Sequence, residues 1–455
     1  MTFWTGDRIV QALGEQLTGA RPAGLRPYTR VVTDSRELST GDVFVALIGE
    51  RFDAHDFLPQ AVQRGAAAVV VSDASRCAGL GVPVFAVDDT TRALGALGNY
   101  RRRVWGGPVV AVAGSNGKTS TKELMAAALS PRFSVHATRG NLNNHIGVPL
   151  TLLAIPDDAE IAVVEIGTNH PGEVGALRAL AEPDIAVVTS VGEEHLEGLG
   201  DLAGVLREES AIFEGVSLAI APAGQPEIGR EARAKGRRVV EAGTDSGDVV
   251  PDTHGLGTDG RGWAQFGNAR LTVPLLGMHN LRNALLAVAV ARACGIPDAE
   301  STAAIALLAP LHMRSTLESF GALTVLNDAY NANPASAREA LALLGTIGAG
   351  RPQVAVLGSM LELGGQGRAL HEEIARRALA SDAQVIAGVG EFVSAFARVA
   401  HDDARVVTAI DAEALWPLLA PRLAPDAVIL LKGSRGTRLE RLVPYLKQFA
   451  ALAPP

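Results

Sequence analysis

The sequence predicts an α/β protein of three domains. These are a small N-terminal α/β domain, a central P-loop-type, mostly parallel sheet with helices on both faces, and a C-terminal Rossmann-like sheet. Three observations predict this class. The chain has 455 residues, too many for one ordinary hydrophobic core. Short aliphatic runs alternate with helical patterns along most of it. Only 4% of residues are aromatic, so aliphatic side chains must bury the strands, as is usual in parallel sheets.

The N-terminal domain is predicted at residues 1–104, where short strands alternate with helices. We expect strands at residues 42–48, 67–71 and 84–87, and helices at 57–64 and 90–103.

The central domain is predicted at residues 105–310, where apolar strands recur and each is followed by a helical segment. This alternation indicates a parallel sheet covered on both faces. Residues 245–262 are rich in Gly and Asp and are interpreted as a surface hairpin region. The expected strands are 109–113, 161–166, 185–189 and 218–221, and the expected helices are 120–129, 280–294 and 299–308.

The C-terminal domain is predicted at residues 311–455, with a further series of strands typical of a doubly wound sheet. We expect the last residues, 450–455, to fray. The expected strands are 322–327, 353–357, 384–388, 406–408 and 427–431.

Composition narrows the class of protein. With 47% hydrophobic and 20% charged residues and a net charge of −8, the chain resembles a soluble globular protein and not a nucleic-acid-binding one. The run Arg101-Arg102-Arg103 is interpreted as the solvated end of a linker. Two cysteines, Cys77 and Cys294, are too few for a disulfide framework or a metal cluster, and we expect both to be inert.

The sequence shows no signal for export or membrane insertion. The N-terminus lacks a basic region followed by an apolar stretch, and the most apolar helical run, 284–291, is too short to span a bilayer. We therefore expect a cytoplasmic protein without membrane insertion, with a monomer as the default state.

Residues 109–120, VVAVAGSNGKTS, predict a phosphate-binding loop between a strand and a helix. Gly114 and Gly117 would let backbone N–H groups approach an anion, Lys118 would reach the outer phosphates, and Thr119 or Ser120 could bind Mg²⁺. The spacing departs from the standard P-loop, because Val112 stands six residues before the lysine. A Gly-rich turn without a ligand is the alternative, but the strand, Gly-Lys-Thr and helix in register favour nucleotide binding.

Polar residues also follow the next two predicted strands of the central domain. Glu165 ends the first of them, and His195 follows the second within VGEEH. The carboxyl ends of parallel strands meet at one edge of a sheet, so we expect both side chains beside Lys118 and Thr119, where a Mg-nucleotide would lie. Either residue alone would more often be structural; agreement of three strand ends favours a site.

The segment RGNLNNHIGVP at residues 139–149 is rich in side-chain amides and carries little charge. Amides can hydrogen-bond a polar substrate, which we favour for this segment. The alternative is an Asn/Gly turn.

Several segments together resemble the Mur ligase family of peptidoglycan synthesis, and the resemblance covers nearly the whole chain. TNHPGE and DAYNANP resemble in particular the members that join D-alanyl-D-alanine to UDP-N-acetylmuramoyl-tripeptide. The segments that carry the resemblance are TDSRELSTGDVFVALIGERFDAHDFLPQAVQRGA, GSNGKTSTKE, GNLNNHIGVPL, EIGTNHPGE, HLEGLG, GMHNLRNALLAVA, NDAYNANPAS, LGSMLELG and LKGSRGTRLE.

The resemblance implies an ATP-dependent amide ligase that works with two Mg²⁺ ions. ATP would phosphorylate the carboxylate of the tripeptide, and the amine of the dipeptide would then displace the phosphate. Residues 1–104 would bind the UDP end of the substrate, and 105–310 would bind ATP. Residues 311–455 would bind the incoming dipeptide and close on ATP.

The resemblance also implies a role for individual residues. The catalytic set would be Lys118, Glu165, His195 and Glu209. The ATP-binding set would be Gly114, Ser115, Asn116, Gly117, Lys118, Thr119, Ser120, His279, Asn283, Arg314 and Asp328. The metal ligands would be Thr119, Glu165, His195 and Glu209. The substrate-binding set would be Asp34, Ser35 and Arg36 for the UDP end, Asn141, Asn144, Thr168 and Asn169 for the peptide, and Tyr330, Asn331 and Asn333 for the dipeptide.

Two positions depart from the family pattern. Members usually carry a lysine fourteen residues after the metal histidine, and CO₂ carbamylates it so that it becomes a metal-binding carboxylate. Here that position is Glu209. Our hypothesis is that Glu209 supplies an unmodified carboxylate; the alternative is a solvated helix face. The second departure is Ser359, where the family often has aspartate, and we assign Ser359 no role.

Three other functions remain as alternatives. The nearest is the ligase that adds the third amino acid to UDP-N-acetylmuramoyl-dipeptide, which lacks the C-terminal asparagine motif. A folate-type polyglutamate ligase would share the central domain but has no evident use for residues 1–104. A P-loop ATPase switch or binding module would cleave ATP without regard to either substrate.

Overall fold

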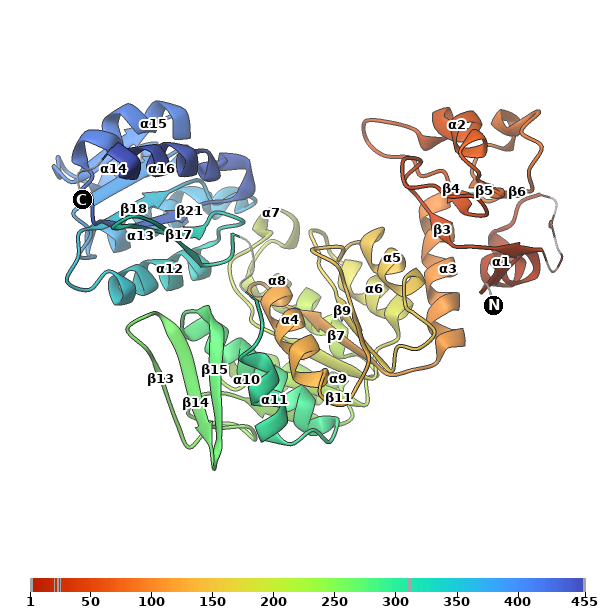
Figure 1. Ribbon diagram of the computed structural model, residues 1–455, viewed down its shortest axis with the longest axis horizontal. Coiled ribbons are helices and arrows are strands. Elements are labelled where there is room, and N and C mark those ends of the chain that lie inside the picture. The colour runs from red at the N-terminus through yellow and green to blue at the C-terminus, as the bar shows by residue number, and fades with distance from the viewer. Residues whose placement is uncertain (1–2, 20, 23, 25, 310–312, 453–455) are drawn as a thin grey trace. The chain divides into compact units, whose positions relative to one another are not determined.

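The computed structural model describes residues 3–19, 21–22, 24, 26–309 and 313–452 (Figure 1). The predicted boundary between residues 310 and 311 lies outside these residues, and the one between 104 and 105 stays a prediction. The chain divides into two compact units. The first comprises Met1–Ala111, Ser134–Gly167 and Gly175–Asp184, and the second comprises Val112–Phe133, Thr168–Val174 and Ile185–Pro455.

A parallel four-stranded sheet forms the core of the N-terminal part of the first unit. Its strands lie in the order β3-β4-β5-β6. Alternate residues face opposite sides, because side chains of a strand alternate. Val43 and Val45 pack with α1 and α3, whereas Phe44 packs with α2. The elements of this part are β1 (Trp4–Thr5), α1 (Gly6–Leu13), β2 (Pro27–Tyr28), β3 (Val31–Val32), β4 (Val43–Val45), α2 (Leu58–Gln63), β5 (Ala68–Val71), β6 (Val84–Ala86) and α3 (Thr90–Trp105).

The interpretation of Arg101-Arg102-Arg103 as a solvated linker end is wrong for the first two residues. Both lie on the buried side of α3. Arg101 donates to the carbonyl of Ile155 at 2.5 Å. Arg102 donates to the carbonyls of Ala181 and Glu182 at 2.9 and 2.8 Å. Ala181 is the last residue of α6 (Glu173–Ala181), and Glu182 follows it. Arg102 thereby satisfies carbonyls at the end of α6. Each guanidinium also pairs with a carboxylate, Arg101 with Asp157 at 2.7 Å and Arg102 with Asp184 at 3.3 Å, which compensates the buried charge.

The central sheet has six strands in the order β12-β11-β10-β7-β9-β8. β10, β11 and β12 pair in parallel, and so do β8 and β9, which confirms the predicted parallel sheet. The elements of this sheet and its helices are β7 (Val109–Ala113), α4 (Lys118–Leu129), β8 (Val135–Ala137), α5 (Gly147–Leu153), β9 (Ile161–Glu165), β10 (Ile185–Val188), α7 (Leu196–Leu199), α8 (Leu202–Ser210), β11 (Leu218–Pro222), α9 (Pro226–Lys235) and β12 (Val239–Ala242).

A small antiparallel sheet follows, in which β14 pairs with both β13 and β15 (Figure 1, green). The predicted surface hairpin at 245–262 contains only β13 (Thr253–Leu256) and the first residues of β14 (Arg261–Phe266). The third strand, β15 (Ala269–Leu276), was not predicted. It leads into α10 (Met278–Ala293) and α11 (Asp298–Ile305), which correspond to the helices predicted at 280–294 and 299–308.

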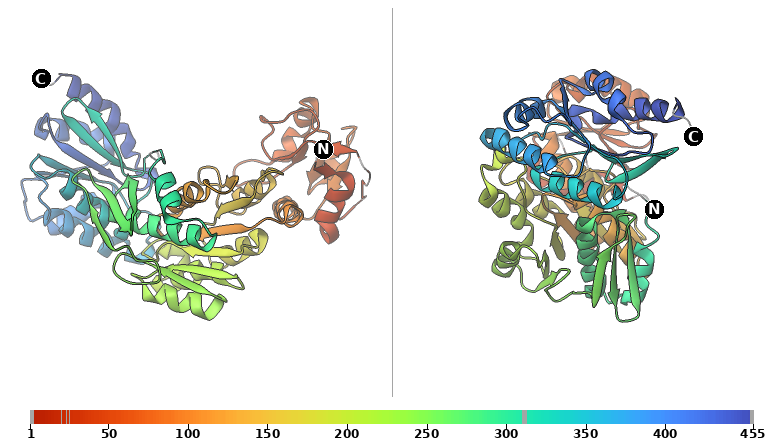
Figure 2. Two further views of the ribbon diagram at one scale, coloured as in Figure 1. Left: turned by 60° about the horizontal axis from the view of Figure 1, so that its bottom comes forward. Right: turned by 90° about the vertical axis from the view of Figure 1, so that its left-hand side faces the viewer.

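The C-terminal sheet has the strand order β16-β17-β21-β18-β19-β20, parallel except for the edge strand β16. Helices cover both faces: α12, α13 and α14 pack on one, and α15 and α16 on the other (Figures 1 and 2). The elements are β16 (Thr316–Phe320), β17 (Leu323–Asp328), α12 (Pro334–Ile347), β18 (Gln353–Leu357), α13 (Gly367–Leu379), β19 (Val385–Val389), α14 (Glu391–Val399), β20 (Val406–Ala409), α15 (Ala412–Leu419), β21 (Val428–Lys432) and α16 (Leu442–Leu452).

The remaining expectations about the chain have mixed outcomes. Among the residues that the structure describes, no helix has the length and apolar run that a membrane crossing needs. Cys77 and Cys294 are free thiols, and burial raises the pKa of each, which suits an inert side chain. Of the residues expected to fray, 450–452 belong to helix α16, and 453–455 lie outside the described residues.

Replacing Arg102 by alanine should destabilise the first unit. The change removes a buried charged donor from two carbonyls, so we expect a loss of about 2–3 kcal/mol in the free energy of unfolding. Calorimetric or urea unfolding measures it. Arg103 is the control: its side chain is 66% exposed and pairs with Glu182. Arg103→Ala should cost less than about 1 kcal/mol. Equal losses for the two variants would contradict the assigned role of Arg102.

Candidate active site

The loop between β7 and α4 comprises residues 114–117 and requires its two glycines. Gly114 and Gly117 have φ angles of 126° and 84°, which other residues rarely adopt. A Cβ atom on Gly114 would lie 2.3 Å from Oγ1 of Thr189, and one on Gly117 would lie 2.5 Å from Nδ2 of Asn283. The N-cap residue of α4 is Gly117, which has no side chain to cap the helix, and a helix N-terminus of this kind is suited to an anion.

Hydrogen bonds to the segment after β10 hold the backbone of this loop. The N–H of Ser115 donates to the carbonyl of Ser190 at 2.8 Å, and Oγ1 of Thr189 donates to the carbonyl of Asn116 at 2.6 Å. A carboxylate holds the first peptide: the N–H of Gly114 donates to Oε2 of Glu209 at 2.7 Å. The loop is therefore fixed by residues more than seventy positions away in the chain.

Lys118 begins α4 and turns back over the loop. Its Nζ donates to the carbonyl of Gly114 at 2.5 Å and lies 3.8 Å from Oε1 of Glu194. Thr119 and Ser120 follow in the first turn, and both are buried. The ammonium group thus lies at the loop, as the sequence predicts for a residue that binds phosphate.

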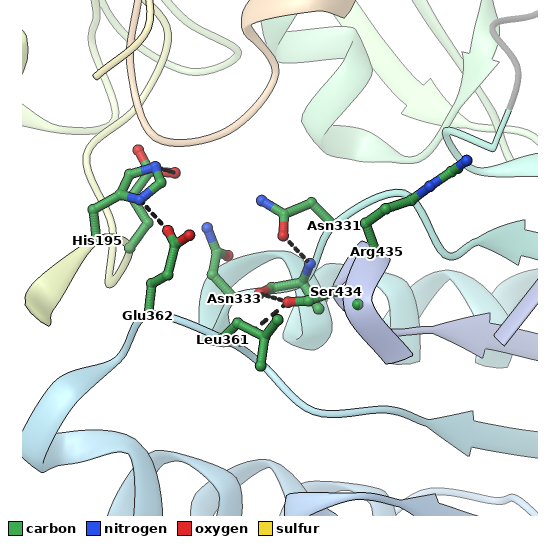
Figure 3. A pocket seen from close by; sticks show the side chains of 10 residues that line it. His195, Asn331, Asn333, Leu361, Glu362, Ser434 and Arg435 are labelled. Atoms are coloured by element: carbon green, nitrogen blue, oxygen red, sulfur yellow. Dashed lines mark hydrogen bonds and ion pairs between the residues drawn. The ribbon is translucent and has the colours of Figure 1, made fainter. Parts of the chain in front are cut away.

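His195 precedes α7 and has a left-handed backbone, with φ of 49°. Its Nδ1 hydrogen-bonds Oε2 of Glu362 (Figure 3). Its Nε2 lies 3.8 Å from Oε2 of Glu194. Burial by itself lowers the pKa of His195, but the hydrogen bond with Glu362 and the charge of Glu194 outweigh it and raise the pKa. The imidazole is therefore oriented by a carboxylate from the C-terminal part of the chain.

Glu194 and Glu209 form a buried pair of carboxyl groups beneath the loop, 5% and 0% exposed. Burial raises the pKa of Glu209 to about 7; the charge of Lys118 opposes the shift and that of Glu194 reinforces it. Burial likewise raises the pKa of Glu194, against the charges of Lys118 and His195. Positive charge brought to this place would favour the ionised form of both groups.

A pocket of about 180 Å³ opens beside these groups. Figure 3 shows His195 and Glu362 at one end and Arg435 at the other, with the amides of Asn331 and Asn333 between them. The lining residues are Glu194, His195, Asn331, Ala332, Asn333, Leu361, Glu362, Ser434, Arg435 and Gly436.

The structure brings Asn333 directly to the phosphate loop. Its Nδ2 donates to Oδ1 of Asn116 at 3.0 Å, while its Oδ1 accepts the N–H of Ser336 and caps α12. Asn331 lines the pocket, and its Oδ1 accepts the N–H of Ala332. The side chain of Asn333 therefore both caps helix α12 and contacts the phosphate loop.

The other predicted residues of the C-terminal part lie near one another. The guanidinium of Arg314 stacks 4.2 Å from the ring centre of Tyr330. Asp328 ends β17 and pairs with Lys432 at 2.6 Å, and it also accepts the N–H of Ser315. A cation–π contact and a buried ion pair thus order the ends of β17 and β21.

The two predicted nucleotide contacts on α10 lie in its first turns. Asn283 is next to Gly117, and its Nδ2 donates to Oδ1 of Asn280 at 3.2 Å. Nδ1 of His279 lies 3.8 Å from Oε2 of Glu339. Of these two residues, Asn283 lies next to the phosphate loop, and the expected nucleotide contact of His279 stays a prediction.

Thr168 and Asn169 lie in a loop that two glutamates organise. Oγ1 of Thr168 donates to Oε1 of Glu208 at 3.2 Å, and the N–H of Asn169 donates to Oε2 of Glu173 at 2.7 Å. Their predicted contact with a peptide stays a prediction.

Glu165 and the amide-rich segment belong to the first unit, whereas Lys118 belongs to the second. Glu165 ends β9, is buried, and accepts Nδ2 of Asn143 at 2.9 Å. Oδ1 of Asn144 accepts the N–H groups of Ile146 and Gly147, as in a local turn, and Asn141 is exposed. The expected proximity of Glu165 to Lys118 stays a prediction.

The predicted UDP-binding residues also lie in the first unit, on an exposed loop after β3. Asp34 pairs with Arg36 at 2.6 Å, and this hydrogen bond lowers the pKa of Asp34 to about 2. The carbonyl of Ser35 accepts Nη1 of Arg64 at 3.0 Å. Arg36 is 83% exposed at its side chain, so it is accessible to a ligand.

Sequence reasoning assigned no role to Glu194, Glu362, Lys432, Ser434 and Arg435. Glu194 stands directly before the predicted histidine, and the other four lie within LGSMLELG and LKGSRGTRLE. The resemblance of these two segments to the family was the only indication in the sequence that they contribute to a site. Which of their side chains face the pocket depends on the loop backbones, since Glu362, like His195, has a left-handed φ of 63°.

The contact between His195 and Glu362 should depend on pH. Because the pKa of His195 is raised, the pair's contribution to stability is fully present below about pH 6.5, where the unfolded histidine titrates. It is lost as the pH rises through the higher folded pKa. NMR titration of the imidazole in metal-free protein should give a pKa above 6.5 that Glu362→Gln lowers. A wild-type value below 6.5 would contradict this assignment.

Three family models match consecutive parts of the chain. The model for the "Mur ligase family, catalytic domain" matches residues 27–102, that for the "Mur ligase middle domain" matches 112–291, and that for the "Mur ligase, glutamate ligase domain" matches 313–435. Together they cover most of the sequence.

Relatives match over almost their whole length. The UDP-N-acetylmuramoyl-tripeptide--D-alanyl-D-alanine ligases of Escherichia coli (strain K12) and Bacillus subtilis (strain 168) are 35% and 33% identical, covering 92% and 91% of this chain and 93% and 92% of their own. A crystal structure of MurF from Acinetobacter baumannii superposes with a TM-score of 0.89 at 30% identity, covering 98% of this chain and 99% of its own. The structure of MurF from Thermotoga maritima in complex with ADP superposes with a TM-score of 0.82 at 27% identity, and the match covers 93% of this chain and 98% of that one.

Agreement over this length confirms the predicted α/β fold class and the resemblance on which the site residues were assigned. The chain belongs to the Mur ligase family.

Proposed function

We propose that this chain joins D-alanyl-D-alanine to UDP-N-acetylmuramoyl-tripeptide with cleavage of ATP to ADP and phosphate. Relatives of that name, 33% and 35% identical over more than nine-tenths of the chain, support the proposal. One observation within the structure carries it furthest. The hydrogen bond between Asn333 and Asn116 brings the segment DAYNANP, expected to face the dipeptide, to the phosphate loop.

The proposed reaction has two steps. An oxygen of the tripeptide carboxylate attacks the γ-phosphorus of ATP, the bond to the β–γ bridging oxygen breaks, and ADP leaves. The dipeptide amine then attacks the acyl carbon, loses a proton, and expels inorganic phosphate. Negative charge spreads over the transferring phosphoryl group, so Lys118 and the N–H groups at the start of α4 would supply its stabilisation.

The proposed roles of the parts follow the same order along the chain. Residues 1–104 would bind the UDP end of the substrate, with Asp34, Ser35 and Arg36 on the exposed loop. Residues 105–310 would bind ATP, with Asn283 beside the loop. Residues 311–455 would bind the dipeptide and close on ATP, which would exclude water from the acyl phosphate.

The donor groups at the loop fit magnesium that is bound together with a nucleotide. Among the described residues no three His, Cys, Asp or Glu side chains form a protein-only metal site. Mg²⁺ at nucleotide sites takes one or two carboxylates and completes its shell with phosphates and water. We propose two ions, with Thr119, Glu165 and His195 among their ligands. Bound Mg²⁺ would neutralise charge on the phosphoryl oxygens.

The proposed substrates are nucleotides and nucleotide-linked precursors, which supports a cytoplasmic site of action. We retain a monomer as the working proposal for the oligomeric state.

Phosphate release with defined substrates tests the proposed function. Purified enzyme should release phosphate only when ATP, UDP-N-acetylmuramoyl-tripeptide and D-alanyl-D-alanine are all present, with tripeptides ending in diaminopimelate and in lysine tried separately. Mass spectrometry should show the pentapeptide product. Release with UDP-N-acetylmuramoyl-dipeptide and a free diamino acid would instead favour the ligase that adds the third residue. Release that ignored both acceptors would favour an ATPase switch.

Lys118→Ala should lower kcat by roughly 10²–10³-fold or more, because the variant loses the charge nearest the phosphate loop. The same phosphate-release assay measures it, and unchanged thermal unfolding would show that the fold is intact. Lys447→Ala, on the exposed side of α16, is the matched control and should turn over like the wild type. Near-normal turnover of Lys118→Ala would refute the assignment of the site.

A further inference from the structure

We propose that Glu194, and not Glu209, supplies the carboxylate that binds a divalent cation of the nucleotide together with His195. The inference rests on the proposed function, because it assumes that a metal–nucleotide complex binds at the phosphate loop. It assigns to Glu194 a role that the motif resemblance does not provide.

Glu194 and His195 both line the pocket beside the loop. Oε2 of Glu194 lies 3.8 Å from Nε2 of His195, which is too far for a hydrogen bond. Two ligands of one Mg²⁺ ion lie at most about 4.2 Å apart, twice the metal–oxygen distance. In an octahedral shell, adjacent ligands lie about 3.0 Å apart and opposite ones about 4.2 Å apart. The observed separation falls between these values, so a shift of less than about 1 Å would let both groups bind one cation.

The second oxygen of Glu194 is buried without a hydrogen-bond donor. Among the described residues Oε1 has no hydrogen-bond partner, and the nearest cationic atom in an ion pair with it is Nζ of Lys118 at 3.8 Å. The residue is 5% exposed. Lys118, His195, Ser115 and Glu209 compensate only part of the burial of this carboxylate. A cation at the pocket would offset the remaining cost.

Glu209 is placed differently, although it occupies the position of the family's carbamylated lysine. Like that of Glu194, its Oε1 is buried without a hydrogen-bond partner among the described residues. Two observations separate the acids: Oε2 of Glu209 accepts the N–H of Gly114 at 2.7 Å, and Glu209 is not among the residues that line the pocket. A glutamate is much shorter than a carbamyl-lysine, so its carboxylate stays behind the loop. We assign Glu209 to positioning the first peptide of the loop.

His195 is oriented for metal binding by its other nitrogen. The hydrogen bond from Nδ1 to Glu362 leaves Nε2 on the side of Glu194. Metal-binding histidines usually donate their second nitrogen to a carboxylate in this way. Both His195 and Glu362 hold left-handed backbones, which non-glycine residues keep mainly where surrounding structure or function requires them.

Mn²⁺ binding tests the inference without relying on turnover. Mn²⁺ is titrated by EPR into protein saturated with a nonhydrolysable ATP analogue, in buffer free of CO₂ and bicarbonate. Glu194→Gln should weaken one Mn²⁺ site by tenfold or more, since losing even a second-layer partner costs about 10–100-fold. Glu209→Gln keeps an acceptor for Gly114 and should retain that site.

Glu193→Gln is the matched control, because Glu193 is adjacent in sequence but pairs with Arg338 at 3.4 Å. It should bind Mn²⁺ like the wild type. Glu194→Asp, which keeps a carboxylate, should retain more affinity than Glu194→Gln and serves if the glutamine variant does not fold.

Unchanged Mn²⁺ binding in both Glu194 variants would overturn the inference, as would a loss in Glu209→Gln alone. Failure of the proposed function is distinguishable. In that case, wild-type enzyme would form no pentapeptide from D-alanyl-D-alanine while its Mn²⁺ binding still depended on Glu194.

Discussion

The site depends on one set of hydrogen bonds, those between the phosphate loop and the segment that follows β10. Thr189 and Ser190 hold the backbone of Asn116 and Ser115, and Thr189 fills the space that a side chain on Gly114 would need. This contact sets the path of the loop, and the same segment continues directly into Glu194 and His195. The cationic and the acidic groups of the site are therefore positioned by one contact between two strand ends.

The C-terminal sheet adds its groups to this frame through two further hydrogen bonds. Asn333 contacts Asn116 of the loop, and Glu362 contacts His195. Both partners come from loops at the carboxyl ends of strands or at the start of a helix, where parallel sheets gather ligand-binding residues. The pocket consequently combines Glu194 and His195 from the central sheet with Glu362 and the amides of Asn331 and Asn333 from the C-terminal one.

The sequence predicted the inner strands of both large sheets, because buried parallel strands are continuous aliphatic runs such as 109–113 and 353–357. It missed the edge strands β8, β12 and β16. The predictions failed where the residue types of a segment do not reveal whether it is buried. Arg101 and Arg102 belong to a charged run that was expected to be solvated, but their side chains are buried and donate to backbone carbonyls. The strand β15 was also missed, although its residues alternate between buried and more exposed positions; it joins a small antiparallel sheet.

By itself the sequence determined the α/β class, the phosphate loop and the family, because these depend on local patterns of glycines, aliphatic runs and short motifs. Only the tertiary structure decided which acid faces the pocket. Glu194 and Glu209 are fifteen residues apart and chemically alike. The left-handed turn at His195 leaves Glu194 at the pocket, whereas helix α8 holds Glu209 against the backbone of Gly114. Side-chain direction depends on backbone geometry that residue spacing does not contain.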